Sequence, residues 1–476
     1  MMLVFVALLM VLAWKATVNS PYQYDEADYM HVARLGLRAN YTDSPTMPIG
    51  EFFHNGLSRG RDARQRAQLS ELIRGTDDII FYRHWNGPVY FYWLMLTSHL
   101  SLDERQMRLL TLMFPICSVV AIYLGCLWIF GGVQGTFAAI VSSSLFVWSV
   151  PAVRSTELAP HQAFVCCYLV CLILLARTMA TGKRSYFYFA AVAAAISCCA
   201  LEVGFVTVAT VIVCGYLERE RLRADWSFAG RALLAFAGTV LVVWPSALLK
   251  LSFVKGYAFM AYISLFRKSP WGQEGLLQTW EKRVLSSPVE WLIIGVSLLA
   301  WIFLRERFPG DLRVMYPFLI FGSLMLAATL RVTTGAPRYA LVFEPSLDVL
   351  AGCIVAGYLL KFAGESRALL LAGVVACLLF AETWINLERH PPVPDARLAS
   401  LLDYVRENHL QSSRLFVPQT DLPTLHYYFP STRLRGYTEA TPKVSEPGER
   451  VSEGVIYPGY PIRYEAPASS GADQNK

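Results

Sequence analysis

The sequence has 476 residues, of which 55% are hydrophobic and only 16% are charged, and its mean hydropathy is +0.39. Soluble globular chains of this size usually carry more charge, so the composition argues against an ordinary soluble protein and indicates that lipid surrounds much of the chain. The net charge of +6 is modest, and nothing in the sequence supports nucleic-acid binding.

The first apolar run, residues 1–14, resembles a signal peptide in its length and hydrophobicity. It lacks a basic region before the apolar residues, and no small-x-small cleavage pattern precedes the polar residues that follow. We interpret it as an uncleaved first transmembrane helix.

Further apolar runs of nearly membrane-spanning length extend to residue 386. An α-helix needs about 20 residues to cross roughly 30 Å of hydrocarbon. By this criterion we expect spans at residues 107–130, 135–150, 161–178, 186–201, 203–217, 231–249, 289–304, 314–330, 340–360 and 368–386. Together with the first helix they make about eleven transmembrane helices, so the expected class is an all-α integral membrane protein.

Four short loops between these spans are basic, and Lys and Arg next to span ends mark the cytoplasmic side of a membrane. These loops are residues 177–184, 218–231, 305–313 and 361–367. Placing them inside puts the N-terminus in the cytoplasm and the C-terminus outside it.

Residues 88–100 (PVYFYWLMLTSHL) look helical but offer only about 13 residues, too few for a full span. Counting them as a span would invert the sidedness of everything downstream. Their Tyr and Trp content favours a juxtamembrane or re-entrant helix at the interface. The first outer loop then covers residues 17–106.

The composition changes sharply after residue 386, beginning with a proline-rich linker at residues 391–394. Residues 396–409 have the pattern of an amphipathic helix, and residues 414–417 that of a short strand. Residues 444–476 are rich in Pro, Gly, Ser and Glu, which is typical of partly disordered chain. We therefore expect two domains, a transmembrane domain at residues 1–386 and a small α/β outer domain at residues 387–476.

An acidic pair, Asp25-Glu26, lies at the outer end of the first helix, with Asp28 close behind it. Acidic residues in the first turn of a helix are favoured by the helix dipole, so position alone favours simple solvation. The sequence that follows the pair favours a functional role instead. A short apolar helix and a polar stretch lead to His84-Trp85-Asn86-Gly87-Pro88 and then to Tyr-rich apolar sequence.

This order of motifs resembles the protein O-mannosyltransferases and the lipid A aminoarabinose transferases, two groups of the GT-C class of glycosyltransferases. Three later features add to the resemblance: Arg108 at the start of the second span, residues 151–157 (PAVRSTE) in the second outer loop, and Pro337-Arg338-Tyr339 followed by Glu344-Pro345. The resemblance implies transfer of a sugar from a polyprenyl-phosphate donor to a hydroxyl acceptor at the outer face. It further implies a single displacement that inverts the anomeric carbon.

The sequence also departs from these families. They often have His-Pro-Pro or Lys-Pro-Pro where this chain has the motif at His84, and an Arg-rich insert occupies residues 59–74. In the second outer loop, where related enzymes often have Asp, the nearest acid is Glu157. Glu157 and His161 lie four residues apart, but a metal site of this type needs a third ligand. A divalent cation therefore has no clear ligand set.

The implied chemistry needs a base for the proton of the incoming hydroxyl and donors for the departing phosphate. We expect Asp25 to be the base, with Glu26 orienting the acceptor or a neighbouring arginine. Solvation explains Glu26 equally well.

Arginine suits the phosphate because its planar guanidinium matches phosphate oxygens bidentately. Arg338 is the first candidate, Arg108 the second, and Arg154 also lies at an expected outer end of a span. Snorkelling to the interface is the alternative explanation for each. His84 is a further candidate for a hydrogen bond to the phosphate or the sugar. The alternative is a histidine that lies at the membrane interface without a role in binding.

A polytopic transporter or lipid flippase is the alternative from another class, with the same charges lining a translocation path. The charged residues fall mainly at expected span ends, which favours chemistry at the membrane surface. The expected partners are a polyprenyl-phosphate sugar, a hydroxyl-bearing acceptor and membrane lipids. The outer segments lack cysteines and contain one Asn-x-Thr site, at Asn40-Tyr41-Thr42, which favours a bacterial inner membrane.

Overall fold

The computed structural model describes residues 1–35, 87–245, 276–329, 337–418, 420–437, 451–456 and 460–465. The chain divides into two compact units. The helical unit consists of Met1–Thr17, Trp85–Tyr90 and Arg108–Pro392. The mixed unit consists of Val18–His84, Phe91–Met107 and Val393–Lys476.

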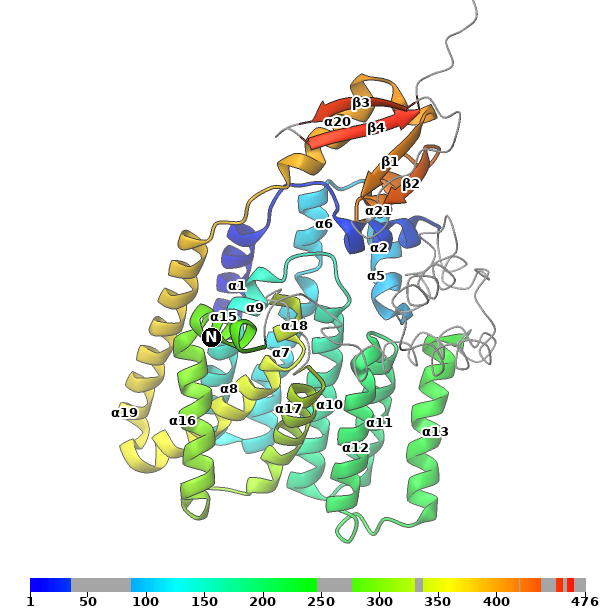
Figure 1. Ribbon diagram of the computed structural model, residues 1–476. Helices are drawn as coiled ribbons and strands as arrows, with labels where there is room; N and C mark the ends of the chain where they lie inside the picture. Colours follow the sequence, from blue (N-terminus) through cyan, green and yellow to red (C-terminus); the bar gives the residue numbers. More distant parts are fainter. Residues whose placement is uncertain are drawn as a thin grey trace, which may run out of the picture. The chain divides into compact units, whose positions relative to one another are not determined.

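The helical unit is a bundle of apolar helices, most of which run roughly parallel to one another (Figure 1). Its helices are α1 (Met2–Ala16), α7 (Met113–Phe130), α8 (Gly132–Val147), α9 (Val150–Arg154), α10 (His161–Thr181), α11 (Arg184–Cys198), α12 (Phe205–Leu217), α13 (Trp226–Val243), α15 (Leu276–Ser286), α16 (Pro288–Leu304), α17 (Tyr316–Thr329), α18 (Pro337–Leu341) and α19 (Glu344–Arg389). Among the described residues, six helices are long and apolar enough to cross a membrane. The chain is thus a multi-pass membrane protein, as expected, while the number of eleven spans stays a prediction.

The two last expected spans, residues 340–360 and 368–386, belong to the single element α19. Gly364 interrupts it with φ 74° and ψ 169°, in the positive-φ region that glycine adopts without steric cost. The chain reverses direction there, so α19 consists of two helical halves (Figure 1).

All four basic loops lie at the same end of the helical unit. Three contacts connect them: the side chain of Arg184 donates to the Leu222 carbonyl, Arg313 pairs with Glu218, and Lys361 donates to the Arg307 carbonyl. The sequence placed these loops on one side of the membrane because of their charge, and the contacts agree. That this side is the cytoplasm stays a prediction.

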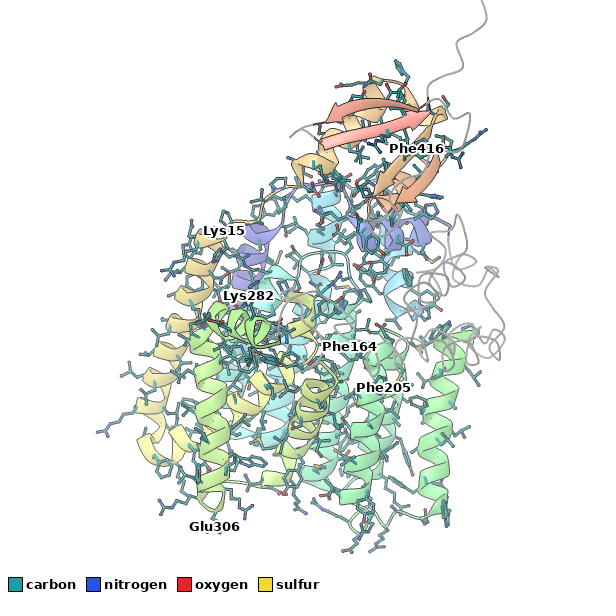
Figure 2. The ribbon with its side chains drawn as sticks, viewed as in Figure 1. Lys15, Phe164, Phe205, Lys282, Glu306 and Phe416 are labelled. Carbon is teal, nitrogen blue, oxygen red and sulfur yellow. The ribbon has the colours of Figure 1, made fainter. Side chains whose placement is uncertain are left out.

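The connections expected outside meet at the other end of the same unit. Lys15 pairs with Glu388, the Asn386 amide donates to the Ser286 carbonyl at 3.1 Å, and Arg338 pairs with Glu157. Figure 2 shows Lys15 near one end of the helices and Glu306, in a basic loop, at the opposite end. The helical unit therefore has two polar ends separated by an apolar layer.

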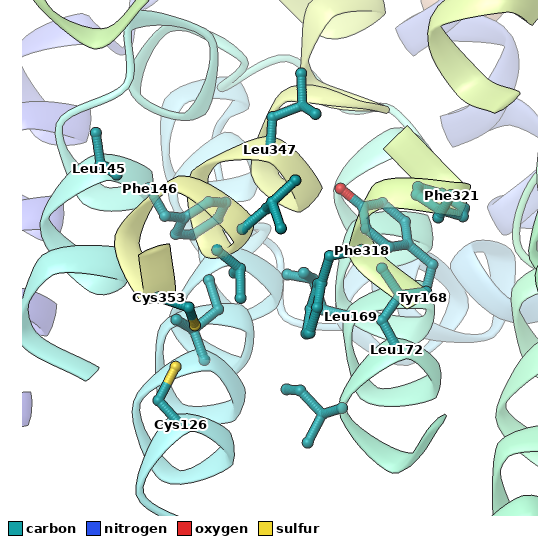
Figure 3. Packing of buried hydrophobic residues seen from close by; sticks show 14 of the residues in the cluster. Cys126, Leu145, Phe146, Tyr168, Leu169, Leu172, Phe318, Phe321, Leu347 and Cys353 are labelled. Atoms are coloured by element: carbon teal, nitrogen blue, oxygen red, sulfur yellow. The ribbon is translucent and has the colours of Figure 1, made fainter. Parts of the chain in front are cut away.

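The core of the helical unit is built from aromatic and aliphatic side chains of α8, α10, α17 and α19 (Figure 3). The ring of Tyr168 stacks on Phe321 with centroids 4.3 Å apart. Helices α8 and α19 cross closely, and a Cβ on Gly352 would lie 2.6 Å from the backbone nitrogen of Ser142. Small residues at such a crossing let two helix backbones approach closely within a membrane.

The helix expected at residues 88–100 is observed as α5 (Pro88–Ser98). Its 11 residues span about 17 Å at 1.5 Å per residue, short of a bilayer core of roughly 30 Å. Gly87 precedes it, and a Cβ there would lie 2.0 Å from the carbonyl oxygen of Cys199. The Val89 amide donates to that same oxygen at 3.1 Å. This close approach gives Gly87 a structural role, while the interfacial position of α5 stays a prediction.

The mixed unit contains helices around a small sheet. Its elements are α2 (Tyr24–Leu35), α20 (Ala396–Glu407), β1 (Arg414–Pro418), α21 (Leu422–Tyr428), β2 (Arg433–Tyr437), β3 (Val451–Ile456) and β4 (Tyr460–Glu465), and α6 (Glu104–Leu110) begins in it. The strand order is β2-β1-β4-β3, with β1 parallel to β2 across α21 and the other pairs antiparallel.

Two features of the mixed unit were expected from the sequence. The helix expected at residues 396–409 and the strand expected at residues 414–417 are observed as α20 and β1. Strands β3 and β4 lie within the stretch whose composition indicated partial disorder. The boundary at residue 387 and the outer location of this part of the chain stay predictions.

Candidate functional site

The acidic pair lies at the start of α2, and the structure gives its two members different surroundings. Glu26 is 5% exposed and its Oε2 accepts a hydrogen bond from the backbone N–H of Gln23 at 3.2 Å. Gln23 precedes the helix, so Glu26 reaches back to the helix start as the acidic residue of a capping box does. Asp25 is half-buried. The structure thus gives Glu26 a structural task.

Asp28 is a third acid of α2 to which sequence reasoning assigned no role. It is 1% exposed and lies three residues after Asp25, so the two side chains share one face of the helix. A carboxylate buried to this extent is costly unless polar groups surround it. The i, i+3 spacing of Asp25 and Asp28, which places both on one face of a short helix, was the signal available in the sequence.

In the helical unit, the structure brings together Arg338 and Glu157, which are far apart in the sequence. Arg338 Nη1 lies 3.6 Å from Glu157 Oε2, and the side chains are 20% and 38% exposed. Next to this pair, the ring of His161 meets the ring of Tyr339 edge-on at 5.8 Å. The short helix α18 thus places Arg338 and Tyr339 next to the loop before α10. That loop contains Glu157, the acid of the second outer loop.

Arg154 makes structural contacts in the same unit. Its Nη2 donates to the carbonyl oxygens of Asn386 at 2.9 Å and His390 at 2.5 Å. These carbonyls belong to the last turn of α19 and the residue after it, where a cation is favoured by the helix dipole. Burial lowers the pKa of the Arg154 guanidinium.

Arg108 is 6% exposed in the last turn of α6. Its burial in a predominantly apolar unit is unusual for an arginine, which is rarely buried without charged or hydrogen-bonding neighbours. His84 and the Arg-rich insert at residues 59–74 lie outside the described residues.

Sequence reasoning missed a buried polar cluster in the helical unit. Glu290, Glu344 and Asp348 are 1%, 2% and 0% exposed, and they interact electrostatically with one another. Arg283 of α15 is 6% exposed and interacts with Glu344. Burial lowers the pKa of the Arg283 guanidinium, and the Glu344 carboxylate acts in the opposite direction. An acid such as Asp348 within an apolar run was the signal in the sequence.

Within the described part of the chain, no group of three or more His, Cys, Asp or Glu side chains is arranged to hold a metal ion. This includes Glu157 with His161, and the buried carboxyl groups.

Comparison with known proteins identifies the fold. No protein-family model matches the sequence, and no curated protein matches it. Among solved structures, the chain is similar to ArnT from Cupriavidus metallidurans bound to undecaprenyl phosphate, with a TM-score of 0.56 and 13% identity over 92% of this chain and 86% of ArnT. It is also similar to the oligosaccharyltransferase of Archaeoglobus fulgidus in the apo form, with a TM-score of 0.56 and 10% identity over 91% of this chain and 64% of that protein.

A second structure from that archaeon, the oligosaccharyltransferase AglB in complex with an inhibitory peptide and a dolichol-phosphate, matches with a TM-score of 0.51 and 13% identity over 93% of this chain and 61% of AglB. At such low identity these similarities establish the fold. The chain has the fold of GT-C membrane glycosyltransferases, and the resemblance seen in the sequence is confirmed at that level.

Proposed function

We propose that this protein is a membrane glycosyltransferase that moves a sugar from a polyprenyl-phosphate donor to a hydroxyl acceptor at the outer face of the membrane. The observation that carries the proposal is the fold shared with ArnT bound to undecaprenyl phosphate, which covers nearly the whole of both chains. The order of the motifs at Asp25, Arg108, Glu157 and Arg338 supports it. The fold comparison gives no support to a transporter.

In the proposed reaction, the acceptor oxygen attacks the anomeric carbon of the donor from the side opposite the phosphate. The bond between that carbon and the phosphate oxygen breaks as the new glycosidic bond forms, so the configuration inverts. Asp25 takes the proton of the acceptor hydroxyl, and the polyprenyl phosphate leaves with the bonding electron pair. A carboxylate is a sufficient base because the phosphate is a good leaving group.

Arg338 is the proposed contact for the departing phosphate. The carboxylate of Glu157 holds its guanidinium in the structure, and a phosphate of higher charge would compete for the same donors. Arg108 is the second proposed contact. We do not assign a phosphate to Arg154, since its guanidinium caps α19. The proposed location is a bacterial inner membrane, with the N-terminus in the cytoplasm and the C-terminus in the periplasm.

The test is Asp25→Asn in purified, reconstituted protein supplied with radiolabelled polyprenyl-phosphate sugars and candidate acceptors. General-base catalysis contributes about 10²- to 10⁴-fold, so we expect a loss of transfer of that size. The matched control is Glu26→Gln, because a carboxamide oxygen still accepts the hydrogen bond from Gln23 and should preserve most activity. Undiminished transfer by Asp25→Asn would refute Asp25 as the base.

A further inference from the structure

The start of α2 is held by the neighbouring helix α21, within the mixed unit. The backbone N–H of Tyr22 donates to the hydroxyl of Tyr428 at 3.1 Å. The hydroxyl of Thr424, which is 1% exposed, donates to the carbonyl of Tyr22 at 2.9 Å. Both backbone polar groups of Tyr22, three residues before Asp25, are therefore bonded to side chains of one helix.

The remainder of α2 is also in contact with α21. Arg34, in the last turn of α2, donates to the carbonyl of Tyr427 at 3.3 Å, and its guanidinium lies 3.7 Å over the ring of Tyr427. Between the two ends, the rings of His31 and His426 meet edge-on at 4.3 Å. Contacts with α21 therefore lie both before and after the acidic residues of α2 in the sequence. Together they restrict the position and the rotation of α2.

Tyr428 connects this contact to α6. Its hydroxyl donates to Oε1 of Glu104 at 2.6 Å while it accepts from Tyr22, so one oxygen joins three segments. Burial raises the pKa of Tyr428, and the hydrogen bond to Glu104 acts in the same direction, so the hydroxyl keeps the proton that it donates. A phenylalanine would retain the ring and lose both hydrogen bonds.

We propose that α21 is a positioning element for α2, and that Tyr428 and Thr424 set the place and direction in which Asp25 meets the acceptor hydroxyl. This inference rests on the proposed role of Asp25 as the base. A general base must come within about 3 Å of the proton it removes, and a misplacement of about 1 Å costs on the order of 100-fold in rate. The two hydrogen bonds to the backbone of Tyr22 help to fix the position of Asp25, and so the distance between its carboxylate and that proton.

The helix α21 has its own support, so it does not depend on α2. Arg397 of α20 binds Asp421 at the start of α21 through two hydrogen bonds of 2.6 and 2.7 Å. Leu425 and Phe429 pack in the core that α20 forms with the sheet. Loss of the Tyr428 hydroxyl should therefore leave the fold of the C-terminal segment intact and loosen its contacts with α2 and with Glu104 of α6.

The test compares Tyr428→Phe and Thr424→Val with Thr424→Ser and Tyr404→Phe in the full chain, reconstituted with donor and acceptor. Thr424→Ser keeps the hydroxyl that binds Tyr22. Tyr404→Phe removes a hydroxyl from α20, beside Gly454. We expect Tyr428→Phe and Thr424→Val to lower kcat about 10- to 100-fold with KM for the donor nearly unchanged, since misplacement acts on the chemical step. Thr424→Ser and Tyr404→Phe should retain wild-type kcat.

Amide hydrogen exchange supplies a readout that is independent of chemistry. In Tyr428→Phe the amides of α2 should exchange faster, while those of α20 should be unchanged. Wild-type kcat for Tyr428→Phe, an equal loss in Tyr404→Phe, or unchanged exchange in α2 would each overturn the inference. Full activity of Asp25→Asn would instead refute the proposed base, and the exchange data would still report whether α21 holds α2.

Discussion

The crossing of α8 and α19 gives a prediction whose size follows from the structure. In Gly352→Ala, the new Cβ would lie 2.6 Å from the backbone nitrogen and 2.7 Å from the Cα of Ser142. Backbone atoms cannot rotate away, so the two helices must separate by about 1 Å to restore ordinary contact. Overpacking of this kind costs about 1–3 kcal/mol, and the better helix propensity of alanine returns less than about 1 kcal/mol.

Gly373→Ala is the matched control, because Gly373 lies in the second half of α19, beyond the turn at Gly364, and a Cβ there meets no atom within 4 Å. We would follow thermal unfolding in detergent with a thiol-reactive dye, since buried cysteines such as Cys126 and Cys353 become reactive only on unfolding. Gly352→Ala should melt several degrees below wild type and Gly373→Ala at or above it. Equal melting temperatures for the two variants would show that the helices do not approach as closely as described.

Three further predictions concern the candidate site. Arg338→Gln should lower kcat/KM for the polyprenyl-phosphate donor about 10- to 100-fold by removing a charged phosphate contact, and an unchanged kcat/KM in donor titrations would exclude that contact. Arg154→Ala should lower the unfolding free energy by about 1–3 kcal/mol, because carbonyls at the end of α19 lose their donor, and the melting temperature measures this. Tyr428 has a raised pKa in the folded protein, so its contribution to stability is complete below about pH 10, the unfolded value, and is lost as the pH rises above it. The difference in melting temperature between wild type and Tyr428→Phe should therefore narrow above that pH, and a constant difference would contradict the assignment.

Much of the fold was predictable because two simple signals are strong in a membrane protein. Length and hydrophobicity located the helices, and the basic loops were correctly grouped, as the contact between Arg313 and Glu218 shows. Two spans joined by the loop at residues 361–367 were also expected, and the structure turns at Gly364 within that loop. Strands β3 and β4 were missed because they lie within residues 444–476, a stretch that is rich in Pro, Gly, Ser and Glu.

The site was predictable in its residue types and less so in its contacts. The motif order selected Arg338 and Glu157, but their pairing depends on how α18 packs, and periodicity carries no information about that. The structural role of Glu26 rests on its burial and on the hydrogen bond that it accepts from Gln23, which only coordinates reveal. Arg154 matched the motif, yet in the structure it caps a helix that begins almost two hundred residues later in the sequence, a contact that sequence patterns do not indicate.

The buried carboxyl groups have a consequence for how the chain enters the membrane. Glu344 and Asp348 occupy the first two turns of α19, and an acidic residue in a span raises the free energy of insertion, by up to about 3 kcal/mol at the centre of the span. The first half of α19 should therefore insert less readily when it emerges alone than it would without these two acids. Helix α15, whose Arg283 interacts with Glu344, and helix α16, which packs against α19, are both synthesised earlier. Release of α19 from the translocon should accordingly depend on helices that are already inserted. The helices should therefore assemble in the order in which they are synthesised.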